Sequence, residues 1–247
     1  MIALLRAELI KLSTTRTFIA LVVAAVGTSL LIASLTSLIG ESSKEDVLTD
    51  VFLSDTSGLF VMILAIIGIT GEWRHRTITS SLLAAPLRVR FLAAKALAYA
   101  VAGLVMSAVV SLAVAVVGWT LLSIQDKPLP EMGDLVGQIA RTVPVSLLPG
   151  ALGVALGSVL RNMTFAVVTV LLLSFAIEPT ITFTVPEVGR WGPTTALPAA
   201  LAGLEASDLG FEETTLPSAG AALLALSAWI GGLFAIGALL LRHRDLE

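Results

Sequence analysis

The sequence predicts an all-α membrane protein with six transmembrane helices, organised as a single domain over residues 1–247. Three observations support this fold class. The chain is 56% hydrophobic and only 13% charged, whereas a soluble domain is roughly 25% charged. Long stretches without any charged residue recur, and several are long enough to cross a bilayer as a helix. Lys and Arg residues are concentrated in alternate connecting segments, which is typical of cytoplasmic loops.

Residues 1–16 predict an amphipathic helix at the membrane interface, with a disordered basic tail as the alternative. Its apolar residues at helical spacing are Ile2, Leu5, Leu9 and Leu12. Its basic residues are Arg6, Lys11 and Arg16. The charge-free run that follows, residues 17–40, is longer than the apolar part of a signal peptide, which is about 7–15 residues. We therefore expect a first transmembrane span here and no cleaved signal.

The charge-free runs give the expected positions of all six spans. They are residues 17–39, about 51–71, a segment within 96–125, 142–160, 162–177 and about 218–241. Pro144 and Pro149 predict a kinked start of the fourth span. The two residues between the fourth and fifth spans, Arg161 and Asn162, predict a tight antiparallel hairpin.

Gly153 and Gly157 in the fourth span have the GxxxG spacing that lets two helices approach closely. We expect them to pack inside the subunit against the fifth or the third span. The alternative is an interface with a second subunit.

Residues 178–217 are too apolar for an ordinary loop and are interrupted by prolines. We expect short broken helices at the outer membrane surface, which dip back beside other helices. Glu178 and Pro179 open this segment. Glu178 is either a solvated acid at the outer interface or a candidate outer gate that faces a cavity, whereas Asp55 is interpreted as a solvated interfacial acid.

The distribution of Lys and Arg predicts the orientation. With the N-terminus inside and six spans, eleven of the fifteen basic residues lie on the inner side. The four on the outer side are Lys44, Lys127, Arg141 and Arg190. This bias places both termini in the cytoplasm of a multi-pass plasma membrane protein.

Several motifs are absent from the sequence. It has no GxxxxGK[ST] phosphate-binding loop and no cysteine, and its two histidines, His75 and His243, lie outside the spans. We therefore expect no catalytic residue, no metal site and no nucleic-acid partner in this chain.

The most basic segment is the loop at residues 72–95, which reads GEWRHRTITSSLLAAPLRVRFLAAK from Gly71. Arginines flank a short uncharged interior, which predicts a small helix along the inner membrane surface. We expect this helix to contact a cytoplasmic partner. The alternative is an anchor to anionic lipid.

Together with the N-terminal RAELIKLSTTRTF, this loop resembles the membrane subunit of a bacterial type-2 ATP-binding-cassette (ABC) exporter. The residues that match the family's loop pattern are Glu72, Trp73, Arg74, Thr77, Pro86 and Arg88. Arg76 stands where the family often has glycine.

The resemblance implies a coupling helix in the 72–86 region that docks on a separate cytoplasmic ATPase. The expected contacts are Glu72, Arg74, Arg76, Thr77, Ile78, Leu82 and Leu83. Two permease subunits, identical or different, would pair with two ATPase subunits, which bind ATP and magnesium. The family's broken extracellular helices resemble residues 178–217. The plasma membrane would then be that of a bacterium.

The apolar spans favour a hydrophobic or amphipathic cargo such as a drug, a peptide or a lipid. Two other function classes remain open. One is a membrane immunity or scaffold protein that binds a partner without transport, and the other is a secondary carrier that works without an ATPase.

Overall fold

A computed structural model describes residues 2–39, 54–74, 88–209 and 214–243. These residues form helices joined by turns, and no strand occurs among them. The elements are α1 (Ile2–Thr14), α2 (Arg16–Ile39), α4 (Ser57–Arg74), α6 (Arg88–Ile124), α7 (Met132–Val145), α8 (Leu147–Leu160), α9 (Met163–Leu172), the π-helix η2 (Leu173–Ile177), α10 (Glu178–Thr184), α11 (Pro186–Gly189), α12 (Ala196–Ala202), the 3₁₀-helix η3 (Ser207–Leu209) and α13 (Ala219–His243).

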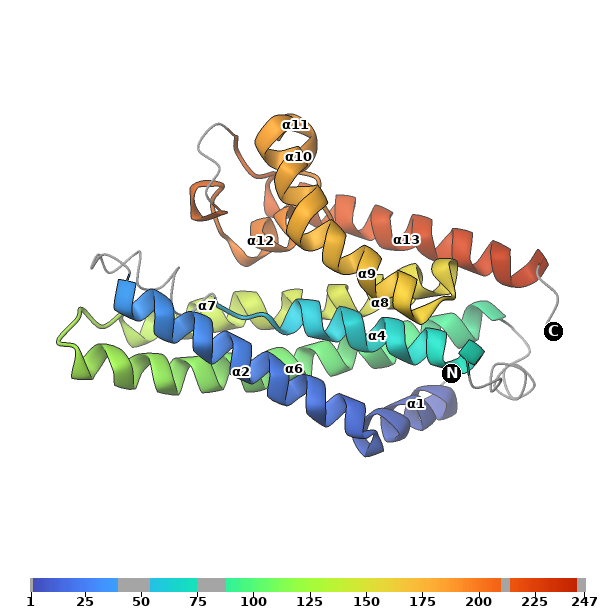
Figure 1. The fold of residues 1–247 in the computed structure, drawn as a ribbon, viewed down its shortest axis with the longest axis horizontal. Coiled ribbons are helices and arrows are strands. Elements are labelled where there is room, and N and C mark those ends of the chain that lie inside the picture. Colours follow the sequence, from blue (N-terminus) through green and yellow to red (C-terminus); the bar gives the residue numbers. More distant parts are fainter. Residues whose placement is uncertain (1, 40–53, 75–87, 210–213, 244–247) are drawn as a thin grey trace.

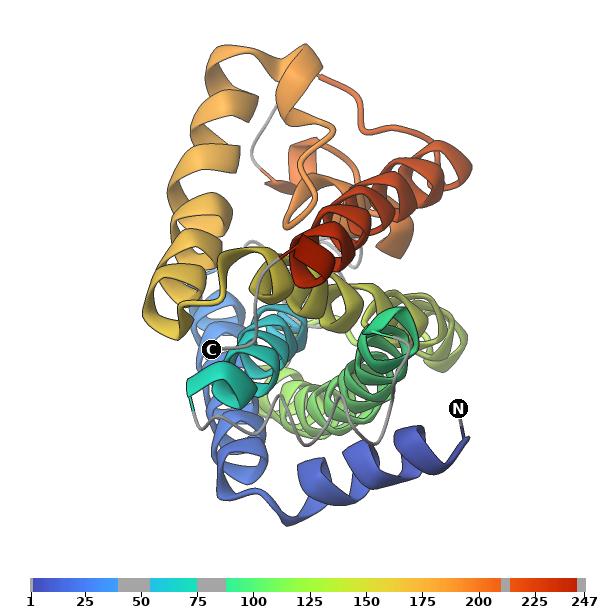
Figure 2. The ribbon, with the colours of Figure 1, turned by 90° about the vertical axis from the view of Figure 1, so that its right-hand side faces the viewer.

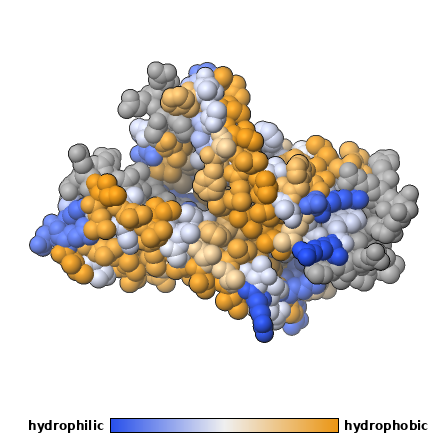
Figure 3. Space-filling model, viewed as in Figure 1, coloured by the Kyte–Doolittle hydropathy of each residue, from blue (hydrophilic) through white to orange (hydrophobic). Residues whose placement is uncertain are grey.

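Within the described residues, six helical segments are long and apolar enough to cross a membrane, as the sequence predicts. They are Arg16–Ile39, Ser57–Arg74, Val89–Ile124, Met132–Leu160, Met163–Thr184 and Ala219–Leu240. Hydrophobic side chains cover the middle of the face shown in Figure 3, and hydrophilic ones lie toward both ends. This pattern suits a protein whose middle lies in lipid.

Most of the long helices run along one axis, and their ends lie at the two ends of the molecule (Figure 1). One end holds α1, the end of α4, the start of α6, the α8–α9 turn and the end of α13. The opposite end holds the end of α2, the end of α6 and the start of α7. The short helix α12 lies beside α13, whereas α10 and α11 stand at the far end of the helix that begins with α9.

Helix α8 is the central element of the fold. It packs against α4, α6, α9 and α13, with α9–α10 and α13 on either side of it (Figure 2). Glycines make the contact with α4 close. A Cβ atom at Gly153 would lie 2.5 Å from the carbonyl oxygen of Met62 and 2.8 Å from the Cβ of Ala65. A Cβ at Gly157 would collide with the side chain of Ile69.

This packing corrects the expected partner of the GxxxG pair. Gly153 and Gly157 face the second span rather than the fifth or the third. The third span meets α8 one turn earlier, where Gly150 lies against the backbone of Tyr99. The pair therefore serves packing within the subunit.

The kinked start predicted for the fourth span occurs as a break between two helices. α7 ends at Val145 and α8 begins at Leu147, with Ser146 as the residue between them. Pro144 lies in the last turn of α7. Because proline lacks an N–H group and crowds the preceding turn, it disfavours a straight continuation. The polar residues before Thr142 belong to α7, so the span begins earlier than expected.

The fifth span continues past the point where the sequence predicts its end. A break was expected at Glu178–Pro179, but the helix runs on through α10 to Thr184. The five residues before Glu178 form a π-helix, and the N–H of Glu178 donates to the carbonyl of Leu173. Pro179 cannot donate its own backbone bond. The wider π-turn accommodates this loss without ending the helix.

Candidate functional site

Four charged side chains meet where α1, α4 and α6 come together. Lys95 of α6 lies 2.7 Å from Glu8 of α1 and 2.9 Å from Glu72 of α4. Lys11 of α1 lies 3.0 Å from Glu8 and 3.4 Å from Glu72. We call these four residues the charge cluster. Its two positive and two negative charges balance, so it can exist away from water.

The charge cluster is buried on one side and open on the other. The side chain of Lys95 is 2% exposed, whereas that of Lys11 is 57% exposed. The rings of Phe91 and Tyr99 lie 5.5 and 5.8 Å from the Lys95 ammonium and add cation–π attraction. Burying an ammonium without partners would be costly, so the contacts with Glu8 and Glu72 are needed to keep Lys95 in this position.

Each helix brings its charge to this point by ordinary packing. The apolar face of α1, formed by Leu5, Leu9 and Leu12, packs against the core next to α6. This orientation turns Glu8 inward, while Arg6 and Arg16 remain exposed. Glu72 lies in the last turn of α4. Lys95 lies two turns inside α6, because α6 begins at Arg88 rather than near Ala96 as expected.

The last turn of α4 has a second anchor. The guanidinium carbon of Arg161, in the α8–α9 turn, lies 4.0 Å from the centre of the Trp73 ring. Arg161 adopts a left-handed backbone with φ of 55°, and Asn162 caps α9 by accepting the N–H of Phe165 at 3.0 Å. The predicted hairpin therefore ties the end of α4 to the fourth and fifth spans.

A cavity of about 640 Å³ adjoins the charge cluster. Its polar wall includes all four cluster residues and Arg74. Its apolar wall includes Leu12, Leu64 and Ile67. A cavity of this size with a polar and an apolar wall is suited to an amphipathic molecule.

Burial alone would raise the pKa of Glu8, but the charges and hydrogen bonds of Lys95 and Lys11 together lower it below its ordinary value of 4.5. The ionised Glu8 therefore stabilises the fold above pH 4.5, and this contribution disappears as the pH falls through the lowered pKa. We expect the Tm in detergent to fall more steeply below pH 4.5 in the native chain than in Glu8→Gln. Parallel pH curves for the two proteins would contradict the pairing.

The predicted coupling residues fall into two groups. Glu72 belongs to the charge cluster, Trp73 stacks with Arg161, and Arg74 is exposed at the end of α4. α6 begins at Arg88. The other predicted contacts lie outside the described residues; these are Arg76, Thr77, Ile78, Leu82, Leu83 and Pro86.

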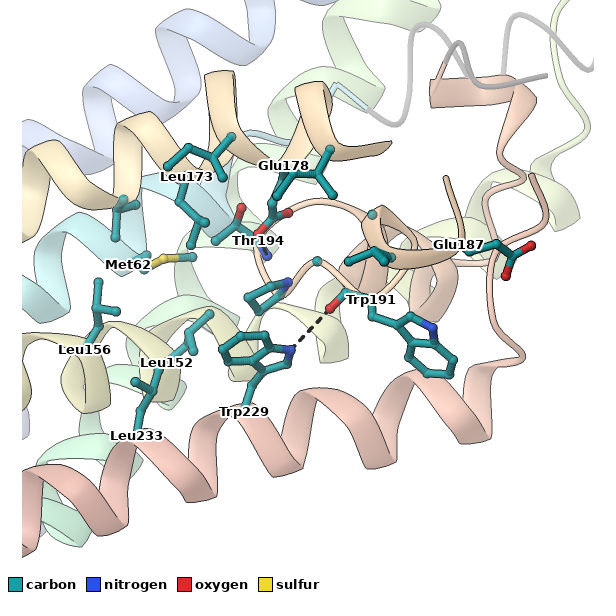
Figure 4. Close-up of a pocket in the computed structure, with 17 residues that line it drawn as sticks. Met62, Leu152, Leu156, Leu173, Glu178, Glu187, Trp191, Thr194, Trp229 and Leu233 are labelled. Atoms are coloured by element: carbon teal, nitrogen blue, oxygen red, sulfur yellow. Dashed lines mark hydrogen bonds between the residues drawn. The ribbon is translucent and has the colours of Figure 1, made fainter. Parts of the chain in front are cut away.

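Glu178 is not the solvated acid of the first interpretation. It is 4% exposed, and its two carboxylate oxygens accept the backbone N–H groups of Thr194 at 2.9 Å and Thr195 at 2.8 Å. Glu178 thereby ties α10 to the segment before α12. It also lines a cavity between α8, α9–α10 and α13, where Figure 4 shows it beside Thr194.

Asp55 also differs from the expected solvated acid. Its carboxylate accepts the hydroxyl of Ser107 at 2.5 Å and the backbone N–H of Ser57 at 2.8 Å. The next residue, Thr56, bonds the hydroxyl of Ser29 at 2.8 Å, midway along α2. Asp55 therefore caps the start of α4 and joins α4 to α6.

Sequence reasoning assigned Lys95 to the basic loop and gave no role to Glu8. One signal was available: Glu8 is the only acid in the first sixteen residues, and Lys95 directly precedes a charge-free run of thirty. Opposite charges at the same ends of neighbouring spans are candidates for pairing.

The chain matches no protein-family model. It also matches no curated protein.

Proposed function

We propose that this chain is the membrane subunit of a bacterial ABC exporter for hydrophobic or amphipathic compounds, driven by a separate cytoplasmic ATPase. The proposal rests on the likeness of residues 72–95 to the coupling loop of that family. The orientation inferred from Lys and Arg places this loop in the cytoplasm. The partners are two ATPase subunits and a second permease subunit.

The observation that carries the proposal is that the charge cluster fixes both ends of this loop. Glu72 lies two residues before the end of α4, and Lys95 lies two turns inside α6. Their side chains are joined to each other and to α1. A force on the loop between them would therefore move α1, α4 and α6 together rather than bend one helix end.

The stack of Trp73 on Arg161 extends the same connection to the fourth and fifth spans. One acceptor near the loop is also available to a further donor. Glu72 Oε2 is buried and has no hydrogen-bond partner among the described residues. A buried acceptor without a partner is costly, so a donor that reaches it on ATPase docking would be favoured.

The adjoining cavity supports the choice of cargo. It opens beside the interfacial helix α1 and has a polar and an apolar wall. An amphiphile could place its charged group near Lys11 or Arg74 and its apolar part against Leu64 and Ile67. Transport would then begin close to the point where the ATPase acts.

The test is to co-express the chain with candidate ABC ATPases, one at a time, purify any complex and measure ATP hydrolysis and export from vesicles. We expect the two proteins to co-purify and ATP to drive export. Binding of a partner without ATP-driven export would instead favour a scaffold or immunity protein. Uptake driven by a proton gradient alone would favour a secondary carrier.

Charge reversal in the loop provides a sharper prediction. Arg74→Glu and Arg76→Glu should each lower ATP-driven export by about ten-fold, because an interface charge of the wrong sign costs about 1.4 kcal/mol or more. Insertion into the membrane should not change. Arg141→Glu, an exposed arginine in α7, is the matched control and should export normally. Normal export by both loop variants would refute the coupling role.

A further inference from the structure

We propose that the cavity between α8, α9–α10 and α13 binds an acyl chain of a membrane lipid. The cavity has a volume of about 480 Å³, which is within the range of small-molecule sites. Leu152 and Leu156 of α8 form its floor, and Trp229 and Leu233 of α13 form one side. This inference goes beyond the proposed function, because it concerns a bound lipid and requires no ATPase.

Most polar groups around this cavity already have partners. The exception is the hydroxyl of Thr194, which is buried without a hydrogen-bond partner among the described residues. Both oxygens of Glu178 accept backbone N–H groups, from Thr194 and Thr195. The indole N–H of Trp229 donates to the carbonyl oxygen of Trp191 at 3.2 Å, as Figure 4 shows. A polar ligand would have to break these bonds to gain its own. The lining is largely apolar apart from this one hydroxyl, so it favours a ligand that is mostly apolar.

The π-helix shapes the side of the cavity opposite α13. Leu173 and Ile177, the first and last residues of η2, both line the cavity. A π-turn contains one residue more than an α-helical turn. Leu173 and Ile177 are therefore related by a different angle about the helix axis than residues four apart in a regular α-helix. Single π-turns are often found at functional sites. Here the π-turn sets the width of the apolar cavity.

The surroundings of the cavity indicate the source of the ligand. Only 17% of the apolar window of the fifth span and 11% of that of α13 are buried. Their outer faces expose large apolar side chains, including Phe175 at 69% and Leu224 at 75%. Both helices pack on α8 and stand on opposite sides of it (Figure 2). In a bilayer, the medium next to this cavity is lipid hydrocarbon.

The experiment uses phosphatidylcholine with a diazirine in one acyl chain, added to the full chain in detergent and photolysed. We expect saturable labelling of residues that line the cavity, above all Leu173, Ile177 and Leu233, and displacement by unlabelled phosphatidylcholine. Labelling spread evenly over exposed apolar residues such as Leu224 would overturn the proposal. So would displacement by pyrene but not by unlabelled lipid, since the ligand would then be a free hydrophobic compound.

A matched pair of substitutions on α13 tests the position of the site. Leu233→Trp fills the cavity, and Leu224→Trp adds the same bulk to an exposed position. We expect Leu233→Trp to weaken lipid binding at least ten-fold, about 1.4 kcal/mol, and Leu224→Trp to leave it unchanged. Equal labelling of both variants would contradict the assignment. The labelling map of the unsubstituted chain remains decisive if Leu233→Trp does not fold.

A second copy of the chain is the competing occupant. Because the chain has no cysteine, Ile177→Cys introduces a single reporter at the cavity wall. We expect this variant to form no disulfide-linked dimer through the cysteine introduced at position 177 under oxidation in membranes while phosphatidylcholine is present. Disulfide-linked dimers through this position would mean that a partner subunit covers the cavity, and would overturn the lipid assignment. Neither result bears on co-purification with an ATPase. The bound-lipid proposal and the exporter proposal can therefore be refuted independently of each other.

Discussion

Replacing Lys95 with methionine should destabilise the protein by about 3–5 kcal/mol, because two buried carboxylates lose their shared partner. Methionine has a similar length but no charge. Glu8 and Glu72 would then share only Lys11, whose side chain is mostly exposed. In thermal unfolding in detergent, this loss corresponds to a Tm lower by roughly 10 °C.

The matched control is Arg90→Met, which removes a charge from an exposed position in the same helix. Its effect should stay within about 0.5 kcal/mol, as for most surface substitutions. Combining Lys95→Met with Glu8→Gln and Glu72→Gln should recover most of the loss, since neutral replacement of a whole buried cluster is often tolerated. If Lys95→Met were as stable as Arg90→Met, the buried pairing would be wrong.

Replacing Gly153 with leucine should cost about 3 kcal/mol or more, because the added atoms would enter the backbone of α4. Even a Cβ atom would lie within 3.0 Å of Met62 and Ala65. The two helices would have to separate, and α8 packs against most of the other spans. The free energy of unfolding, measured by denaturant in mixed micelles, reports this loss.

Gly232→Leu in α13 is the control for Gly153→Leu. A Cβ at Gly232 meets no atom within 4 Å, so the side chain has room. Leucine also has a higher helix propensity than glycine, by up to about 1 kcal/mol. We therefore expect Gly232→Leu to be neutral or stabilising. A Gly153→Leu protein that loses only its dimeric state, with unchanged stability, would instead support the subunit interface that the sequence left open.

The six spans could be predicted because each depends on a local property, the length of an apolar run in a lipid solvent. The last span, expected at about 218–241, is the helix Ala219–His243. The fifth span was predicted too short at Glu178–Pro179. Proline usually ends a helix, and nothing in the local sequence indicates that a π-turn will absorb the missing bond.

The candidate site was less predictable, because it depends on which helices become neighbours. Glu8 and Lys95 are 87 residues apart and meet only after α1 folds back against α6. Glu178 was noticed as an unusual acid, but its partners are backbone groups sixteen and seventeen residues later. The GxxxG pair showed that a close contact would form without showing which helix would form it.

The separation of the charge-cluster residues along the chain constrains how the protein is made. Glu8 and Glu72 emerge from the ribosome before Lys95, which lies at the start of the third span. Until that span is in place, two carboxylates that will be buried have only Lys11 to balance them. The N-terminal helix therefore reaches its final position only after the third span arrives. A nascent chain stopped before Lys95 should leave α1 accessible to protease, and one that extends past α6 should protect it.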